Sequence, residues 1–381
     1  MKLTILTQEY PPHHYGGAGV LVGELSVFLS KLINVEVRYF GHEQREISPS
    51  LSVTGYDCNI KEDNSNKILK VLFNSIAMVD RRADIVHAFP WHTSLGAVFL
   101  KKRYNIPLVF TPTSLEKLRP WKKEATANEY AVSSYIEDLC IKNADKLVAF
   151  TTDMKNDLIA CHDVPEDKIS IIPAGVDTII YKKTFCEKVL TKYGIKKDYI
   201  LFVGRKSKQK GIEHLINAIS LMKNNIQIVL CLGKADSDEY DRSIKDKLLK
   251  LNRDIVIIEN KDTYIKEEII SLYSHAMLII VPSIYEPFGL VNIEAMACET
   301  PVIANNTGGM KDIIKNEETG FLVNAENSQL FAHKIDTLLA APLHLKKIGK
   351  KAREDMIERY DWRVIAQQYC SIYKNLLGKN D

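Results

Sequence analysis

Two glutamates, eight positions apart, are the residues best suited to chemistry in this sequence. Glu286 follows an apolar run at Met277–Val281, which predicts a buried parallel strand that ends at Pro282. Glu294 lies inside a helix predicted over Leu290–Ala297. One carboxylate is therefore expected in a loop at the carboxyl end of a strand, and the other about one turn into the following helix.

The start of that helix is a predicted anion site. Pro287 and Gly289 predict a turn into the helix, whose first N–H groups, near Leu290 and Val291, have no partner within it. Unpaired N–H groups of this kind bind anions. An anion site with a carboxylate on either side suits a ligand that carries phosphates and hydroxyls, such as a nucleotide sugar. The alternative is an amphipathic helix with two solvated glutamates.

A basic cluster lies earlier in the same half of the chain. Arg205 and Lys210 follow a predicted strand at Tyr199–Val203 and precede a predicted helix. Arg205 can hold two phosphate oxygens, and Lys210 adds a point charge. Alone, the two residues could form a solvated basic turn. Their position at the carboxyl end of a strand, in the same half as Glu286 and Glu294, favours phosphate binding.

A glycine-rich loop opens the first half. Gly16, Gly17 and Gly19 follow a predicted strand at Lys2–Thr7 and precede a predicted helix from Val20. Glycines allow backbone N–H groups to approach a phosphate or a sugar. By itself the pattern indicates only a turn, and it lacks the Gly-x-Gly-x-x-Gly spacing of a dinucleotide site.

The elements that must position these residues alternate between strand and helix. The strands predicted in the first half are Lys2–Thr7, Val35–Phe40, Asp84–Ala88, Pro107–Thr111, Lys146–Phe150 and Ile169–Ile172. Those in the second half are Tyr199–Val203, Ile226–Leu230, Ile255–Ile258, Met277–Val281, Pro301–Ala304 and Phe321–Val323. The alternation predicts α/β domains with parallel sheets, and 381 residues are enough for two of them.

Three longer strings resemble one enzyme family. The string Tyr285–Val302 resembles the Glu-x7-Glu signature of retaining glycosyltransferases with two Rossmann-like domains. The string Gly204–Gly211 resembles their Gly-Arg-x4-Lys-Gly element. Together with Glu9–Gly19, these strings look like the family 4-like glycosyltransferases of the bacterial and archaeal glycogen synthase and maltose-1-phosphate synthase branch.

This resemblance implies a fold and a domain plan. The expected fold is α/β and of the GT-B type, with two Rossmann-like doubly wound domains facing a central cleft. Residues 1–182 would form an acceptor domain, 183–197 a linker, and 198–360 a nucleotide-sugar donor domain. Residues 361–381 would form a C-terminal helix that crosses back to the N-terminal domain.

The resemblance also implies roles for single residues. Arg205 and Lys210 would hold the donor diphosphate, Glu286 would contact the donor sugar hydroxyls, and Glu294 would hold the ribose hydroxyls. The expected catalytic set is Glu286, Arg205 and Lys210. The full expected donor-binding set is Gly16, Gly17, Arg205, Lys210, Glu286, Phe288, Gly289, Leu290, Val291 and Glu294. Transfer would retain the anomeric configuration without an enzymic nucleophile.

Two positions depart from the pattern of that branch. Thr113 stands where a histidine normally lies against the donor sugar, and Phe89 replaces a second active-site histidine. A threonine hydroxyl can donate a hydrogen bond but cannot become cationic. The acceptor-side candidates are His14, Thr113 and Trp121. Trp121 could stack on a sugar or simply pack on its own domain.

Composition limits the partners. The net charge of +3 is too small to predict nucleic acid as a partner. No apolar run approaches the roughly 20 residues of a membrane span, so a cytoplasmic protein without a transmembrane segment is expected. Seven scattered cysteines predict neither a zinc site nor a disulfide framework. The acidic string at 236–238 is expected to cap a helix, so neither a metal site nor an obligatory cofactor is predicted.

The predicted partners are a nucleotide-sugar donor and a glycan or sugar acceptor. The predicted function is retaining transfer of a glucosyl unit from ADP- or UDP-glucose to an α-glucan or a sugar phosphate. Two alternatives stay open: a glycosyltransferase with a lipid, envelope or small-metabolite acceptor, and a degenerate relative that binds sugar nucleotides without catalysis. No pattern in the sequence predicts the nucleobase or the oligomeric state.

Overall fold

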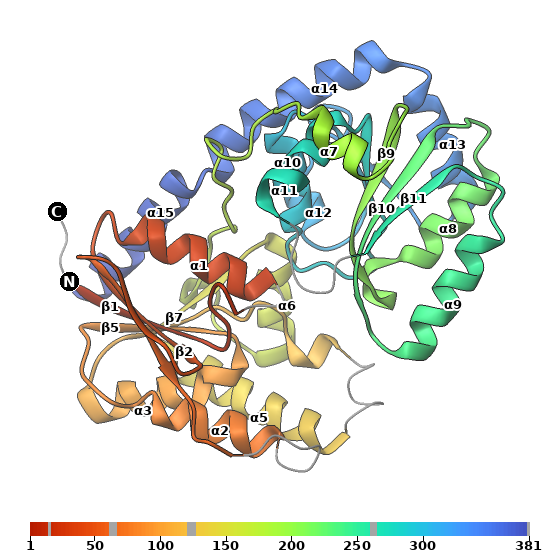
Figure 1. Cartoon of the computed structure of the whole chain (residues 1–381). Coiled ribbons are helices and arrows are strands. Elements are labelled where there is room, and N and C mark those ends of the chain that lie inside the picture. The colour runs from red at the N-terminus through yellow and green to blue at the C-terminus, as the bar shows by residue number, and fades with distance from the viewer. Residues whose placement is uncertain (14–16, 61–66, 120–126, 260–264, 379–381) are drawn as a thin grey trace. The chain divides into compact units, whose positions relative to one another are not determined.

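A computed structural model describes residues 1–13, 17–60, 67–119, 127–259 and 265–378. These residues form two compact units (Figure 1). The first comprises Met1–Ala174 and Trp362–Asp381, and the second comprises Gly175–Asp361. The C-terminal helix α15 (Trp362–Leu376) therefore belongs to the first unit, although the whole second unit precedes it in sequence.

The first unit is built on an eight-stranded sheet in the order β3-β4-β2-β1-β5-β6-β7-β8. Every neighbouring pair is parallel except β3 and β4, which are antiparallel. The strands are β1 (Lys2–Thr7), β2 (Asn34–Phe40), β3 (Gln44–Ser48), β4 (Leu51–Tyr56), β5 (Ile85–Phe89), β6 (Leu108–Phe110), β7 (Lys146–Ala149) and β8 (Ile169–Ile171). The central strands are buried on both faces, including the polar side chains of Thr4 on β1 and His87 on β5.

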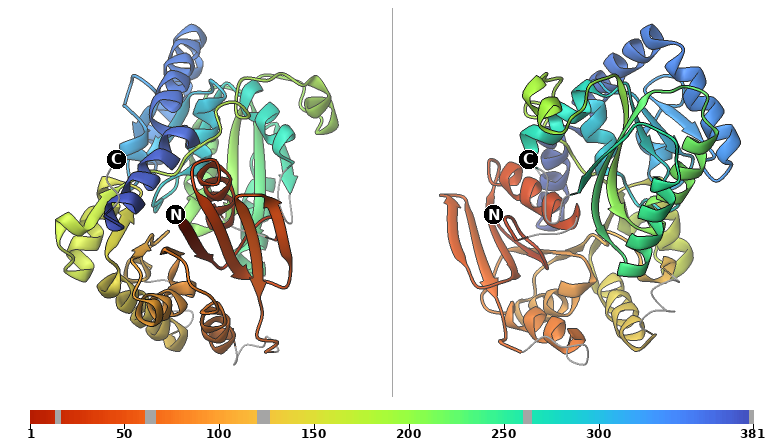
Figure 2. Two further views of the ribbon diagram at one scale, coloured as in Figure 1. Left: turned by 90° about the vertical axis from the view of Figure 1, so that its left-hand side faces the viewer. Right: turned by 45° about the vertical axis from the view of Figure 1, so that its right-hand side comes forward.

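Helices cover both faces of this sheet. The helices are α1 (Gly17–Leu29), α2 (Lys67–Ala77), α3 (Ser94–Tyr104), α5 (Ala127–Asn143), α6 (Thr152–His162) and α15. Helices α2 and α3 lie along one face and α1 and α15 along the other, as the views of Figure 2 agree. The Trp362 ring of α15 stacks on Phe28 of α1, with 6.4 Å between the ring centroids.

The second unit has a six-stranded parallel sheet in the order β11-β10-β9-β12-β13-β14. Its strands are β9 (Tyr199–Lys206), β10 (Gln227–Ala235), β11 (Ile255–Glu259), β12 (Leu278–Val281), β13 (Val302–Asn305) and β14 (Phe321–Val323). Its helices are α7 (Glu187–Lys192), α8 (Ile212–Leu221), α9 (Asp238–Leu249), α10 (Lys266–His275), α11 (Leu290–Ala297), α12 (Met310–Ile313), α13 (Ser328–Leu339) and α14 (Pro342–Asp355). The predicted class, α/β with two Rossmann-like doubly wound halves, is confirmed.

The structure differs from the sequence predictions in several elements. Strand β9 continues past Val203 to Lys206, so Arg205 lies in the strand and not in a loop after it. Strands β3 and β4 were not predicted. The stretch 183–197, predicted as a linker, lies inside the second unit, where Val189 is buried and α7 contacts α10.

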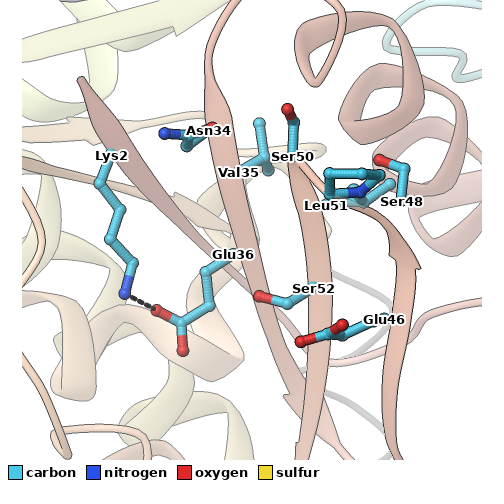
Figure 3. Close-up of a pocket in the computed structure, with 10 residues that line it drawn as sticks. Lys2, Asn34, Val35, Glu36, Glu46, Ser48, Ser50, Leu51 and Ser52 are labelled. Carbon is cyan, nitrogen blue, oxygen red and sulfur yellow. Dashed lines mark ion pairs between the residues drawn. The ribbon is translucent and has the colours of Figure 1, made fainter.

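A small polar pocket lies at the amino edge of the first sheet (Figure 3). Its volume is about 220 Å³, and Lys2, Asn34 and Leu51, at the starts of β1, β2 and β4, help to line it. Burial alone would raise the pKa of Glu36 in this pocket, but hydrogen bonds from Arg38 and other cations lower it to about 2. Parallel sheets bind ligands at the opposite, carboxyl edge, so this pocket is not the candidate site.

Among the described residues, no helix combines the length and the apolar character that crossing a bilayer requires.

Candidate active site

Arg205 is presented by the paired ends of β9 and β10. Gly233 lies opposite it in the ladder, and a Cβ there would lie 3.5 Å from the arginine Cγ, an ordinary van der Waals contact. The Arg205 side chain is 45% exposed, and one guanidinium nitrogen lies 3.5 Å from Oδ1 of Asp236. The next side chain, Lys206, is buried and pairs with Asp241 and Glu259. Arg205 therefore points to solvent beside a strand end that its neighbour anchors.

The turn after β9 is packed against the loop after β12. Gly211 has a φ of +65°, and a Cβ at this position would lie 2.0 Å from the carbonyl oxygen of Pro282. The N–H of Ile284 donates to the carbonyl oxygen of Gln209 at 3.0 Å. Because both contacts are made by the backbone, the turn that carries Lys210 is fixed next to the loop that carries Glu286.

Lys210 and Glu286 meet in this place. Nζ of Lys210 lies 2.5 Å from Oε2 of Glu286, and the Ser283 hydroxyl donates to the same oxygen at 3.2 Å. Glu286 is only 8% exposed. The structure thus joins the two predicted constellations, a basic residue and an acidic residue 76 positions apart in sequence.

Two glycines hold the backbone of the Glu286 loop. The N–H of Gly309 donates to the carbonyl oxygen of Glu286 at 2.9 Å. Gly308 has a φ of +51°, and a Cβ there would lie 2.4 Å from the same oxygen. Sequence reasoning assigned no role to Ser283, Gly308 or Gly309. The adjacent glycines after β13 were the available signal, because a paired glycine often marks a close backbone approach.

Helix α11 begins as the sequence predicts. Gly289 precedes it with a φ of +113°, a conformation that favours glycine. Because the capping residue is a glycine, it has no side chain that could accept a hydrogen bond from the first N–H groups of the helix, at Leu290 and Val291. Phe288 is 5% exposed and packs 6.1 Å from the Tyr360 ring, measured between centroids. Phe288 therefore contributes packing next to the helix start.

Glu294 is held by a residue that sequence reasoning missed. The hydroxyl of Tyr273, on α10, donates to Oε2 of Glu294 at 2.9 Å. Burial raises the pKa of Tyr273 well above its usual value, so the phenol stays a neutral donor. The sequence carries no signal for this contact, because a tyrosine on the apolar face of a helix indicates only a core residue.

The remaining predicted residues lie in the first unit. Gly17 is the first residue of α1. His14, Gly16 and Trp121 lie outside the described residues. Thr113 is half-buried in the segment that follows β6.

Phe89 is a fully buried residue at the end of β5. Its ring lies 4.1 Å from that of His87, which is also fully buried. Nε2 of His87 lies 2.8 Å from the Thr111 hydroxyl, and Nδ1 lies 2.7 Å from the hydroxyl of Tyr373 on α15. Burial lowers the pKa of His87, which keeps the ring neutral. The phenylalanine therefore packs in the core beside a histidine that has structural partners.

The acidic string at 236–238 opens α9. Ser237 is the capping residue, and its hydroxyl accepts the N–H of Tyr240 at 3.1 Å. Across the parts of the chain that the structure describes, no group of three or more His, Cys, Asp or Glu side chains is arranged to hold a metal ion.

Two family models match the sequence. The model described as Glycosyltransferase Family 4 matches residues 15–179. The model described as Glycosyl transferases group 1 matches residues 187–355.

Two curated relatives align along nearly the whole chain. An alpha-maltose-1-phosphate synthase from Mycobacterium tuberculosis is 31% identical over 391 aligned positions, which cover 99% of this chain and 100% of that protein. A D-inositol 3-phosphate glycosyltransferase from Corynebacterium efficiens is 26% identical over 385 positions, which cover 94% of this chain and 90% of that protein.

Solved structures share the fold. Sucrose-phosphate synthase from Thermosynechococcus elongatus superimposes with a TM-score of 0.84 at 23% identity and covers 100% of both chains. Anabaena HepE, in complex with UDP and glucose, gives a TM-score of 0.76 at 19% identity and covers 98% of this chain and 99% of that one. The shared fold is GT-B. With this fold and a relative 31% identical along its full length, the chain belongs to the glycosyltransferases of the Family 4 and group 1 models, near the maltose-1-phosphate synthases.

Proposed function

We propose that the chain is a retaining glucosyltransferase that moves a glucosyl unit from ADP- or UDP-glucose to an α-glucan or a sugar phosphate. The observation that carries this proposal is the contact between Lys210 and Glu286, 2.5 Å long, which joins the turn after β9 to the loop after β12. It brings a cation for a diphosphate together with a carboxylate for sugar hydroxyls, and the strand that leads into this turn, β9, carries the exposed guanidinium of Arg205 near its end.

The leaving group of such a transfer is a nucleoside diphosphate. Negative charge builds on its β-phosphate as the glycosidic bond breaks, and preorganised donors for that charge are worth roughly 3 kcal/mol each. In this proposal Arg205 and Lys210 supply two of these donors. The N–H groups of Leu290 and Val291 supply others, because they stand at an uncapped helix start.

The hydroxyl-binding groups are the two glutamates. Glu286 would orient the donor sugar, and Glu294, aligned by Tyr273, would accept hydrogen bonds from the ribose hydroxyls. Retention fits a reaction in which the acceptor attacks from the side that the diphosphate leaves, with the leaving phosphate taking the acceptor proton. No enzymic nucleophile is required.

A phosphorylated acceptor has the most support. Both curated relatives reported above are named for a sugar phosphate or an inositol phosphate. This favours a sugar phosphate over the lipid or envelope acceptors that the sequence alone leaves open.

The proposed reaction uses no obligatory metal, because Arg205 and Lys210 already bring positive charge to the leaving diphosphate. We therefore expect EDTA to leave the transfer rate unchanged. We also place the protein in the cytoplasm, since none of its seven cysteines, all in described parts of the chain, forms a disulfide.

The first test is thermal stabilisation by ADP, UDP, GDP and their glucose conjugates. A ligand that binds the folded state raises Tm, and at a concentration 100 times its Kd it adds about 2.7 kcal/mol of stability. We expect one nucleotide pair to stabilise the protein, and Glu294→Ala and Arg205→Ala to abolish the shift. No shift with any nucleotide, from well-folded protein, would refute the proposal.

The second test separates catalysis from binding. The stabilising nucleotide sugar is incubated with glucose 1-phosphate or maltooligosaccharides, and the product is analysed by NMR for its anomeric configuration. An α-linked product supports the proposal. Binding without transfer to any acceptor would favour the degenerate, non-catalytic alternative, which the absence of histidine at Thr113 and Phe89 also favours.

A further inference from the structure

Each cation of the candidate diphosphate site already has a carboxylate neighbour. Lys210 contacts Glu286 at 2.5 Å, and Arg205 lies 3.5 Å from Asp236. The two pairs differ in exposure. The side chains of Lys210 and Glu286 are 25% and 10% exposed, whereas those of Arg205 and Asp236 are 45% and 44% exposed. The second pair is therefore the weaker one and the easier one for an anion to replace.

The backbone places Asp236 beside Arg205. Strands β9 and β10 pair up to their ends, and the register shifts between Gly233 and Ala235. Directly after this irregularity, the N–H of Asp236 donates to the carbonyl oxygen of Lys206 at 3.1 Å. The position of Asp236 therefore depends on main-chain bonds, and a change of its side chain should leave it in place.

The side chain of Asp236 is not needed for the helix that follows. The hydroxyl of Ser237 caps α9. The carboxylate of Asp236 therefore acts on Arg205 without a role in holding the helix.

We propose that Asp236 is a positioning residue: it pairs with Arg205 while the site is empty, and the pair separates when Arg205 binds the donor diphosphate. This inference rests on the proposed function, and it adds a determinant of nucleotide affinity to that site. A diphosphate offers two oxygens to the guanidinium fork, and this bidentate bond is stronger than the single contact with Asp236. The displaced carboxylate then stays close to the bound phosphates and repels them.

This repulsion acts more strongly on the product than on the donor. The free nucleoside diphosphate carries more negative charge than the nucleotide sugar, whose terminal phosphate is esterified. Asp236 therefore weakens product binding more than donor binding, and it favours release of the product after transfer.

The experiment is isothermal titration of the full chain with ADP, UDP and their glucose conjugates. Asp236→Asn removes the charge and keeps the shape of the side chain. We expect it to bind the nucleoside diphosphate about two- to five-fold more tightly, the range that an exposed ion pair supports. The gain for the nucleotide sugar should be smaller, and both gains should shrink in high salt. Asp236→Glu keeps the negative charge, so we expect it to bind both ligands with the wild-type affinity.

Asp238→Asn is the matched control. Asp238 is exposed, lies two positions further on in the first turn of α9, and loses the same charge. We expect its affinities to equal those of the wild type. A tighter complex cannot result from damage to the fold, so a gain specific to Asp236→Asn supports the inference.

Four results would overturn it. Weaker binding by Asp236→Asn would mean that Asp236 itself contacts the ligand. Equal gains in Asp236→Asn and Asp238→Asn would assign the effect to overall charge and not to the pair with Arg205. If the wild type binds none of the nucleotides, the proposed function fails and this inference fails with it; if the wild type binds but Asp236→Asn shows no gain, only the inference fails.

Discussion

Glu286 and Glu294 are held by different kinds of neighbour. Glu286 contacts a cation, Lys210, and the Ser283 hydroxyl, whereas Glu294 accepts a hydrogen bond from the neutral phenol of Tyr273. In the proposed reaction Lys210 binds phosphate, so the ligand and Glu286 compete for the same cation. The phenol of Tyr273 donates a hydrogen bond to Glu294 without bringing a positive charge to it.

The contact between Tyr273 and Glu294 predicts a defined kinetic change. Tyr273→Phe removes one hydrogen bond to a charged group, so the carboxylate loses its alignment. We expect KM for the nucleotide sugar to rise about three- to ten-fold while kcat stays within about two-fold of the wild type. The matched control is Tyr193→Phe, which removes a similar bond to Glu268, 2.5 Å long, outside the candidate site. An equal KM for both variants would contradict the role assigned to Tyr273.

Thr113 allows a test of the missing histidine. Thr113→His restores a side chain that can become cationic near the donor sugar. If the site is active but weakened, kcat should rise by about ten-fold, less than the roughly hundred-fold that a fully preorganised donor supplies, because the introduced ring is not positioned by matching neighbours. Single-turnover transfer from the nucleotide sugar measures this directly. An unchanged rate would mean that the histidine is not the limiting defect.

At the scale of elements, glycine backbones bring the site loops together. Gly211 lets the basic turn approach Pro282, and Gly308 lets the loop after β13 approach Glu286. Both glycines have positive φ angles, so a side chain would add strain as well as a clash. The separation of Lys210 from Glu286 therefore depends on atoms of the main chain.

Gly308→Ala tests this dependence. Strain at a positive φ costs about 1 kcal/mol, and the clash with the carbonyl oxygen of Glu286 adds to it, so we expect a loss of about 2–3 kcal/mol. Gly194→Ala is the control, because Gly194 has a similar φ of +68° with no atom within 4 Å of its added Cβ. Urea unfolding gives both values. Equal losses would show that the clash is relieved, and that the Glu286 loop tolerates movement.

The sequence predicts the elements of the site better than their edges and contacts. Helix α11 and strand β14 have the predicted bounds, because a turn glycine and a short apolar run mark them. Strand β9 extends beyond its prediction, since Arg205 and Lys206 are charged and only the pairing with β10 makes them strand. Strand β3 is polar and mostly exposed, so it has no apolar pattern from which a strand could be predicted.

The contacts that align the site residues could not be predicted from the sequence, for a related reason. Tyr273 acts on Glu294 from a different helix, 21 positions away, and Asp236 reaches Arg205 from a neighbouring strand end, 31 positions away. A sequence motif consists of residues that lie close together in the sequence. Partners that tertiary packing supplies leave no comparable pattern.

At the scale of the whole molecule, the last helix of the chain belongs to the same unit as its first strands. His87 on β5 and Tyr373 on α15 are 286 positions apart, and their hydrogen bond joins the first and last parts of the first unit. His87, which makes this contact, is fully buried. The C-terminal helix is thus part of the core of the first unit.

This burial predicts that the stability of the first unit depends on pH. The folded protein keeps His87 neutral, while the unfolded chain binds a proton below the ordinary pKa of 6.5. Stability is therefore present above that pH and is lost as the pH falls through it, with a slope that approaches about 1.4 kcal/mol per pH unit. Between pH 7 and pH 5 we expect a loss of about 1–2 kcal/mol.

Tryptophan fluorescence isolates this unit, because the three tryptophans of the chain, at positions 91, 121 and 362, all belong to it. Urea unfolding at pH 7, 6 and 5 gives the slope for the wild type and for His87→Gln, which can form hydrogen bonds but cannot titrate. Burial also lowers the pKa of His162. His162 contributes equally to both proteins, so the difference between the slopes belongs to His87. If His87→Gln and the wild type have the same slope of stability against pH, the buried histidine does not link protonation to the docking of the C-terminal helix.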